Sequence, residues 1–206
     1  MYHLPQTQLS LDRGGGNVRV LVACEESQAV CIAFRKLGHE AYSCDTQECS
    51  GGHPEWHIQA DVLPLINGNK PFITMDGDLH AIIGTWDLLI AFPPCTYLTN
   101  AGSVRLRVKG KINEERMAKA IEAKAFFMRF LEADCQKICV ENPTPGRIHQ
   151  LPEYTQAIQP WWFGHPYTKR TCLWLKNLPP PYPYRYYSRG RYPLCEWRLK
   201  RRSWEL

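Results

Sequence analysis

The chain has 206 residues, which suits one domain or one domain with a tail and is enough to bury a hydrophobic core. Apolar residues make up 44% and charged residues 22%, and no apolar stretch approaches the roughly 20 residues of a membrane helix. These values argue against a membrane span. The net charge of +5 is concentrated near the C-terminus, where we expect contacts with a polyanion.

The N-terminal residues and the cysteines indicate where the chain works. Residues 1–17 lack the basic-then-apolar pattern of a secretory signal, and three consecutive glycines predict a flexible segment there. The nine cysteines are odd in number, and several lie within apolar runs. Reduced thiols and a cytoplasmic location therefore fit better than disulfide bonds.

The first part of the chain predicts a strand, a helix and a second strand. Residues 18–23 form a short β-branched run, and residues 41–44 form another that ends at Asp45. Between them, four apolar residues recur at helical spacing before Gly38: Val30, Ala33, Phe34 and Leu37. Such a unit predicts parallel pairing with a right-handed crossover, as in nucleotide-binding α/β proteins.

The middle of the chain predicts an inserted hairpin and a third strand. Residues 72–75 and 79–83 are separated by two aspartates and a glycine, which favours a small hairpin. Residues 86–92 form an apolar strand that stops at two prolines, directly before Cys95. We expect a loop to begin there.

The rest of the chain predicts a long helix and three more strands. Residues 113–133 should form an amphipathic helix, whose apolar side holds Met117, Ala120, Ile121, Met128 and Leu131. Residues 137–140 should form a buried strand that ends at Glu141, and residues 161–163 and 171–175 should form two more. The chain then becomes rich in proline.

Two segments are basic and have two interpretations each. Residues 103–111 form a basic loop that could close over a nucleic acid strand or simply be solvated: Arg105, Arg107, Lys109 and Lys111. Residues 182–204 combine basic and aromatic side chains, which could contact phosphates and stack on bases or belong to a disordered tail.

One group of residues has a spacing compatible with zinc ligands: Cys44, Cys49, His53 and His57. Cys44 falls in a predicted buried strand, however, and the spacing matches no common zinc finger. We therefore predict no metal site.

Polar or reactive residues follow successive predicted strands at the turn 24–28, at Asp45, at Cys95 and at Glu141 with Asn142. Because the carboxyl ends of parallel strands meet at one edge of a sheet, these residues should share a crevice. Each has a structural explanation by itself, because a cysteine often packs and a glutamate often caps a helix or pairs with arginine. Their combination is more specific.

The segments DLLIAFPPCTYLT, ICVENP and YTKRTCLWL occur in this order and resemble motifs of the C5-cytosine-specific DNA methyltransferase family. The resemblance covers about residues 18–175. It implies an α/β, Rossmann-like S-adenosylmethionine-dependent methyltransferase fold, with a mostly parallel sheet, flanking helices and the small hairpin insertion. It also implies three parts: a flexible segment (1–17), a catalytic domain (18–178) and a Pro-rich, then basic-aromatic tail (179–206).

The resemblance assigns roles to individual residues. Cys95 matches the nucleophile that adds to carbon 6 of cytosine, and Glu141 matches the acid that bonds N3 and the exocyclic amine. Arg170 matches the first arginine of a Gln-x-Arg-x-Arg motif and would favour the thiolate form of the cysteine. The residues implied to bind S-adenosylmethionine are Cys24, Glu25, Glu26, Ser27, Asp45, Asp61, Phe92 and Pro93. The implied partner is DNA with its cytosine flipped out, in a bacterial or phage-infected cell.

The chain departs from the family in several ways. The family opens with Phe-x-Gly-x-Gly, but residues 24–28 contain no glycine, and Cys172 replaces the second arginine of the later motif. There is little room for a separate target-recognition domain. Methylation of cytosine in RNA and a catalytically silent DNA-binding protein therefore stay open as alternatives.

Overall fold

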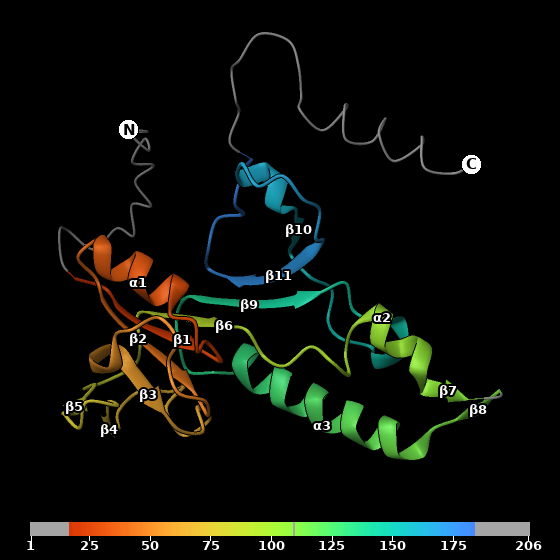
Figure 1. The fold of residues 1–206 in the computed structure, drawn as a ribbon, viewed down its shortest axis with the longest axis horizontal. Coiled ribbons are helices and arrows are strands. Elements are labelled where there is room, and N and C mark those ends of the chain that lie inside the picture. The colour runs from red at the N-terminus through yellow and green to blue at the C-terminus, as the bar shows by residue number, and fades with distance from the viewer. Residues whose placement is uncertain (1–16, 109, 184–206) are drawn as a thin grey trace, which may run out of the picture.

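A computed structural model describes residues 17–108 and 110–183 (Figure 1). The predicted flexible segment, apart from Asn17, and the part of the predicted tail from residue 184 onward lie outside the described residues. Among the described residues, no helix is both long and apolar enough to cross a membrane.

Seven strands form the central sheet of the described chain, in the spatial order β10-β11-β9-β6-β1-β2-β3. In chain order they are β1 (Arg19–Ala23), β2 (Glu40–Asp45), β3 (His57–Gln59), β6 (Leu88–Ala91), β9 (Ile138–Pro143), β10 (Gln156–Ile158) and β11 (Thr171–Lys176). All neighbouring strands pair in parallel except β11, which runs antiparallel to both β9 and β10. The predicted mostly parallel α/β sheet is confirmed.

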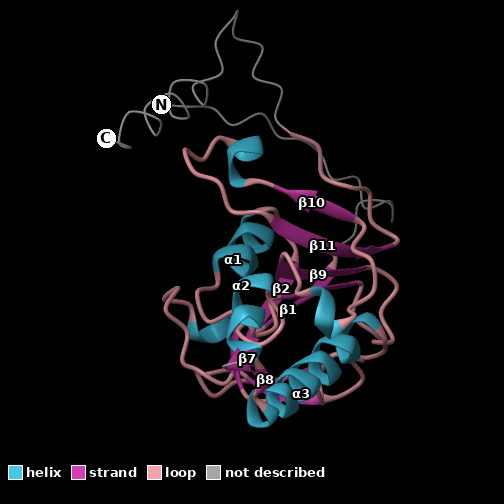
Figure 2. Ribbon diagram, turned by 90° about the vertical axis from the view of Figure 1, so that its right-hand side faces the viewer, coloured by secondary structure: helices cyan, strands magenta, loops and turns pink. Residues whose placement is uncertain are grey.

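Helices cover both faces of this sheet, as Figure 2 shows for α1 (Ala29–Lys36) and α3 (Glu114–Leu131). Side chains alternate between the faces along each strand. Val20 and Val22 pack with Cys31 of α1, whereas Leu21 and Leu89 belong to the larger core that includes α3. Whether a residue is at an odd or an even position along its strand therefore decides which of the two hydrophobic clusters its side chain packs into.

Helix α3 buries a narrower stripe than the sequence predicted. Ala120, Phe127 and Phe130 are fully buried, and the Phe127 ring packs edge-on against Trp174 at 4.9 Å between centroids. Ile121, predicted on the apolar side, is 64% exposed. The prediction was wrong there because each residue advances about 100° around the helix, which turns Ile121 away from the face shared by Ala120 and Phe127.

The edge of the sheet differs from the prediction at one element. Residues 161–163 are not a strand but part of a 3₁₀ helix, η4 (Pro160–Phe163), and the edge strand is β10. Pro160 has no N–H to give to a sheet, and Gly164 ends the turn at φ 88°. The predicted hairpin is confirmed as β4 (Pro71–Ile73) and β5 (Leu79–Ala81).

The predicted basic loop at residues 103–111 also contains regular structure. It holds the end of α2 (Asn100–Ser103), η2 (Val104–Leu106), β7 (Arg107–Val108) and the start of β8 (Lys111–Ile112). Figure 1 shows α2 and the β7–β8 hairpin beyond the end of the sheet toward which the β9 arrow points. The remaining short elements are η1 (Pro54–Trp56) and η3 (Arg147–His149).

Replacing a buried and an exposed residue of α3 tests this packing. We expect Phe127→Ala to lower the free energy of unfolding by about 3–5 kcal/mol, because it leaves a cavity beside Trp174. Ile121→Ala should change it by less than about 0.5 kcal/mol. Urea denaturation measures both values, and similar losses in the two variants would contradict the observed orientation of α3.

Candidate active site

Two loops that follow neighbouring parallel strands pair with each other at the carboxyl edge of the sheet. The loop after β6 contains Cys95, and the loop after β9 follows Glu141. Asn100 N donates to Thr144 O at 2.8 Å. Gly146 N donates to the carbonyl of Leu98 at 2.8 Å. The turn of Cys95 is thereby attached to the segment that continues from Glu141.

Cys95 lies in a tight turn just beyond β6. Its carbonyl accepts hydrogen bonds from Leu98 N at 3.1 Å and Thr99 N at 3.2 Å, and its thiol is free and partly exposed. Pro93 is buried, while Phe92 is half-buried and its N–H donates to Ala23 O at 3.0 Å. The turn thus holds the predicted nucleophile at the edge of the sheet without burying its sulfur.

Close packing between Gly146 and Ser103 holds the two loops together. The Ser103 hydroxyl contacts both Thr99 O at 2.9 Å and the Nε2 atom of His149 at 3.1 Å. A Cβ atom on residue 146 would overlap Ser103 Oγ and lie 3.0 Å from the ring of His149. Glycine is therefore required for this approach of the backbones.

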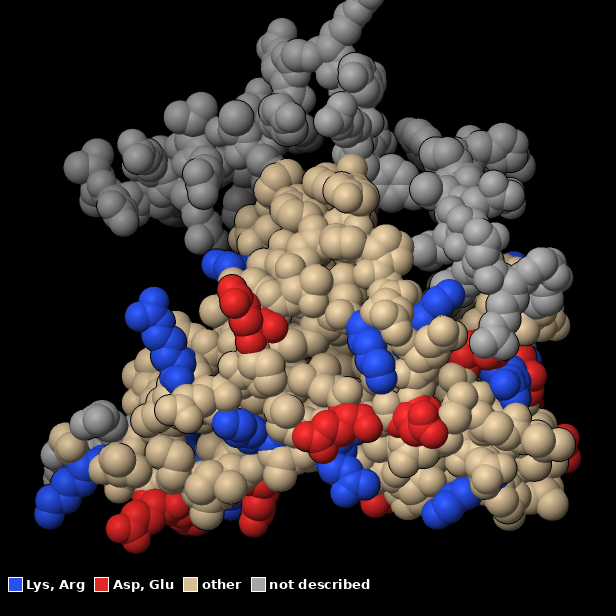
Figure 3. Space-filling model, turned by 180° about the vertical axis from the view of Figure 1, so that it is seen from behind, with Lys and Arg blue, Asp and Glu red and all other residues tan. Residues whose placement is uncertain are grey.

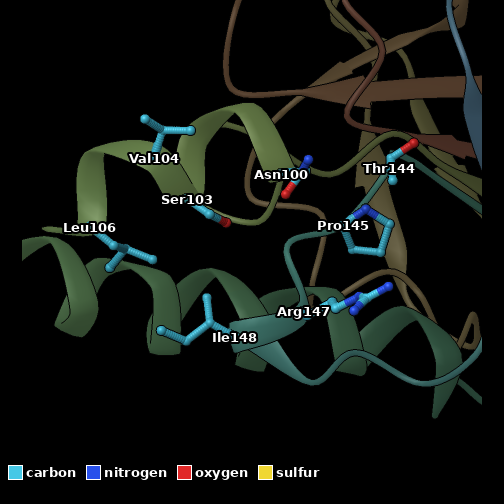
Figure 4. A pocket seen from close by; sticks show the side chains of 8 residues that line it. All are labelled: Asn100, Ser103, Val104, Leu106, Thr144, Pro145, Arg147 and Ile148. Carbon is cyan, nitrogen blue, oxygen red and sulfur yellow. The ribbon is translucent and has the colours of Figure 1, made fainter.

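A cavity of about 630 Å³ lies between the same two loops. Figure 4 shows Val104 and Leu106 on the α2–η2 wall and Pro145 and Ile148 on the opposite segment. Asn100, Ser103, Thr144 and Arg147 supply polar groups to its lining. Its volume is in the range of small-molecule sites, roughly 300–1,000 Å³.

Glu141 and Asn142 lie within β9 rather than after it, because the strand continues to Pro143. Their side chains point to opposite faces: Asn142 is fully buried, and Glu141 is half-buried on the side of the sheet that carries α1. Burial raises the pKa of the Glu141 carboxyl, and the positive charge of Lys169 opposes that rise. Glu141 therefore keeps its proton to a higher pH than an exposed glutamate does.

The charged residue that acts on Glu141 is Lys169, not Arg170. Strand β11 pairs Leu173 with Glu141, and Lys169 lies two residues before this strand begins. The Arg170 Nη2 atom instead donates to Tyr154 Oη at 2.6 Å, and Tyr154 packs against the core on the α3 side. Sequence reasoning missed Lys169, because only the tertiary structure shows which charge lies near Glu141.

The turn at residues 24–28 keeps a sharp bend although it contains no glycine. Cys24 and Gln28 have φ angles of 58° and 57°, in the left-handed region that favours glycine. The Gln28 side chain is fully buried and bonds the backbone of His53, accepting from its N at 3.0 Å and donating to its O at 2.8 Å. This clamp holds the strained conformation in place.

The acidic residues of the same turn have structural partners. The Glu25 carboxylate accepts from Val30 N at 2.6 Å and from Cys31 N at 3.2 Å, so it caps the start of α1, and burial raises its pKa. Glu26 is hydrogen-bonded to the hydroxyl of Ser50. Ser27 is exposed.

Asp45, Asp61 and Cys24 gather at the ends of β1, β2 and β3. The pKa of the Cys24 thiol rises to about 12, mainly through burial and further through the charges of Asp45 and Asp61. Each aspartate accepts a backbone N–H through Oδ1, from Gln47 and Leu63 respectively. Their Oδ2 atoms have no hydrogen bond to the described residues, so this corner is an acidic cradle with free acceptors.

The residues with zinc-like spacing have other partners. The buried His57 ring contacts Ser43 Oγ at 2.8 Å and Gln47 O at 2.9 Å, and His53 contacts Glu55 and stacks on Trp56. Within residues 17–108 and 110–183, no group of three or more His, Cys, Asp or Glu side chains is arranged to hold a metal ion.

No protein-family model matches the chain, and no curated protein sequence matches it. Among solved structures, it is similar to an rRNA methylase from Escherichia coli, with 17% identity and a TM-score of 0.37, over 78% of this chain and 57% of that one. It is also similar to WbdD in complex with the kinase inhibitor LY294002, with 11% identity and a TM-score of 0.39, over 77% of this chain and 36% of that one. A second structure of WbdD, described as a bifunctional kinase-methyltransferase, gives 12% identity and a TM-score of 0.39, over 77% of this chain and 35% of that one.

The chain spans little more than half the length of that methylase and about a third of WbdD. The fold follows from the sheet itself. Its strand order, with β11 inserted antiparallel between β9 and β10, and its helices on both faces are those of the Rossmann-like methyltransferase fold.

A clash and its relief test the contact between the two loops. We expect Gly146→Ala to lower the melting temperature, because the new methyl group overlaps Ser103 Oγ. Adding Ser103→Ala should recover much of that loss, whereas Ser103→Ala alone should have a smaller effect than Gly146→Ala. Differential scanning fluorimetry measures all three variants, and strictly additive losses would contradict this contact.

The charge next to Glu141 is testable by titration. We expect Lys169→Gln to raise the pKa of Glu141 further, because the opposing positive charge is lost. Arg170→Gln, on the other face, should leave that pKa nearly unchanged. Carbon-13 NMR of the glutamate carboxyl groups measures both, and a larger rise with Arg170→Gln would contradict the role of Lys169.

Proposed function

We propose that this chain is an S-adenosylmethionine-dependent methyltransferase that acts on carbon 5 of cytosine in DNA, with Cys95 as its nucleophile. The observation that carries this proposal is the backbone pairing between the loop of Cys95 and the segment that follows Glu141. A free, partly exposed cysteine and a glutamate whose pKa is raised by burial then lie at one edge of a methyltransferase-fold sheet.

The acidic cradle supports the proposed cofactor. Asp45 and Asp61 offer carboxylate oxygens that would accept hydrogen bonds from the hydroxyl and amine groups of an adenosine, and the bent turn 24–28 lies beside them. The negative field of the two aspartates also suits a cationic ligand. When bound, S-adenosylmethionine supplies an electrophilic methyl group on a sulfonium sulfur.

Cys95 and Glu141 would activate the base together. The Cys95 thiolate adds to carbon 6, and the ring electrons that move toward carbon 5 make that carbon nucleophilic. Glu141 passes its proton toward N3, so no net negative charge builds up on the ring. After the methyl group has moved to carbon 5, that carbon loses its proton to water, and the returning electron pair expels Cys95 as a thiolate. N3 then returns its proton to Glu141, which restores the neutral base and the starting form of the acid.

The positive charge of Lys169 acts on Glu141. Cys172, which stands in place of the second arginine of the family's motif, cannot supply such a charge. We propose that Lys169 helps to hold the polar edge of the base there. Arg170 is hydrogen-bonded to Tyr154 on the other face. It would therefore help to position the segment that precedes β11 and would not act directly on Glu141.

One observation favours a catalytically silent binding protein. Glu25 and Glu26 are occupied by α1 and by Ser50, which leaves fewer groups of the turn for a cofactor. The left-handed angles of Cys24 and Gln28 nevertheless give this turn a backbone conformation that glycine usually supplies.

Covalent trapping tests the proposed reaction. With cofactor and an oligonucleotide containing 5-fluorocytosine, carbon 5 carries no proton to lose, so wild type should form an adduct that survives denaturing electrophoresis. Cys95→Ser should form none, whereas Cys49→Ser, which removes another partly exposed thiol, should form it. Glu141→Gln should slow adduct formation by about 10²- to 10⁴-fold.

Two outcomes would contradict the proposal. If DNA gives no adduct but RNA does, the substrate is RNA and the chemistry stands. If wild type binds DNA but forms no adduct with either nucleic acid, the silent alternative holds.

A further inference from the structure

The C-terminal part of the described chain combines aromatic side chains with a complete lack of acidic ones. No Asp or Glu occurs between Glu153 and Glu196. Within this stretch, residues 160–167, which we call the aromatic edge, carry Trp161, Trp162, Phe163, His165 and Tyr167. Such a composition favours a polyanionic partner with flat, stackable groups.

The aromatic edge projects from the border of the sheet instead of filling the core. Trp161 and Trp162 lie in η4, directly after the edge strand β10, with ring centroids 6.1 Å apart at 79°. Both are only half-buried, and neither packs against the hydrophobic clusters formed by the described residues. Tyr167 is 51% exposed. Figure 3 shows the uncharged projection at the top of the described part of the back face.

Positive charge follows these rings in the sequence. Lys169 and Arg170 follow the aromatic edge directly, and both are exposed. The Gln156 Nε2 atom donates to Pro181 O at 2.9 Å, which attaches the end of the described chain to β10. The described residues that follow the aromatic edge are therefore cationic and include no acid, which favours a partner with phosphate groups over an apolar one.

We propose that the aromatic edge binds single-stranded DNA, with unpaired bases stacked on Trp161 and Trp162 and phosphates near Lys169 and Arg170. This inference rests on the proposed function, because flipping a cytosine out of a duplex leaves bases next to it without their normal stacking partners. Lys169 connects the two surfaces, since it follows the aromatic edge and also acts on Glu141. Any base can stack on an aromatic ring, so this surface would bind DNA with little preference for its sequence.

Equilibrium binding of a fluorescein-labelled single-stranded oligonucleotide tests the proposal, measured by anisotropy without cofactor. The Cys95→Ser background keeps the measurement independent of methyl transfer. We expect Trp161→Ala and Trp162→Ala each to raise Kd by roughly 5- to 100-fold, because stacking on one aromatic ring contributes that much. Trp→Phe at either position should restore most of the affinity, and it also guards against misfolding of the alanine variants.

The matched control is Ile83→Ala, which removes an exposed apolar side chain (85% exposed) remote in sequence from the aromatic edge. It should leave Kd unchanged. Blunt duplex DNA should bind more weakly than the single strand. Unchanged affinity in folded tryptophan variants would overturn the proposal. If wild type forms no covalent adduct but still binds single-stranded DNA through the aromatic edge, the proposed function is wrong and the proposed binding surface is supported.

Discussion

Backbone hydrogen bonds between the loops after β6 and β9 hold the candidate site together. The two strands are parallel neighbours, so their loops leave the sheet at the same edge, but proximity alone would not order them. The bonds from Asn100 to Thr144 and from Gly146 to Leu98 give the loops a fixed register. The register fixes where the Cys95 thiol lies relative to β9, and the close approach at Gly146 makes it possible. Without this pairing, the loop that carries the Cys95 thiol would not be attached to the segment that continues from β9.

Alternation along β9 and β11 then divides the functional groups between two faces. Glu141 lies on the face of α1 and is acted on by the charge of Lys169, whereas Asn142, Cys172 and Arg170 belong to the other face. Partial burial makes the ionised form of Glu141 unfavourable, and the one nearby cation that acts on its pKa limits this effect. A carboxyl whose pKa is raised in this way keeps its proton to a higher pH than an exposed glutamate and is a better proton donor there. The same burial lowers stability as pH rises above the ordinary glutamate pKa, since unfolding lets Glu141 ionise in water.

The turn after β1 adopts left-handed backbone angles although it contains no glycine. Two non-glycine residues hold left-handed angles there, at a cost of order 1 kcal/mol each. Gln28 offsets the cost by bonding both backbone groups of His53, and Glu25 strengthens the start of α1. The loop at residues 50–53 thus becomes part of the turn. Gly51 permits this, because a Cβ there would overlap Gln28.

Sequence alone determined most strands and helices, though not β3 or β10, together with the inserted hairpin and the polar residues at the strand ends, because each depends on local periodicity and on where apolar runs stop. It also singled out Cys95, since two prolines end a strand just before it. Tertiary structure decided the rest. Whether Arg170 or Lys169 faces Glu141 depends on pairing with β11, and a one-residue shift reverses the face of every side chain. The partners of Glu25 and Gln28, the exposure of Ile121 and the loop pairing at Gly146 all depend on residues distant in the chain, whose approach no local pattern records.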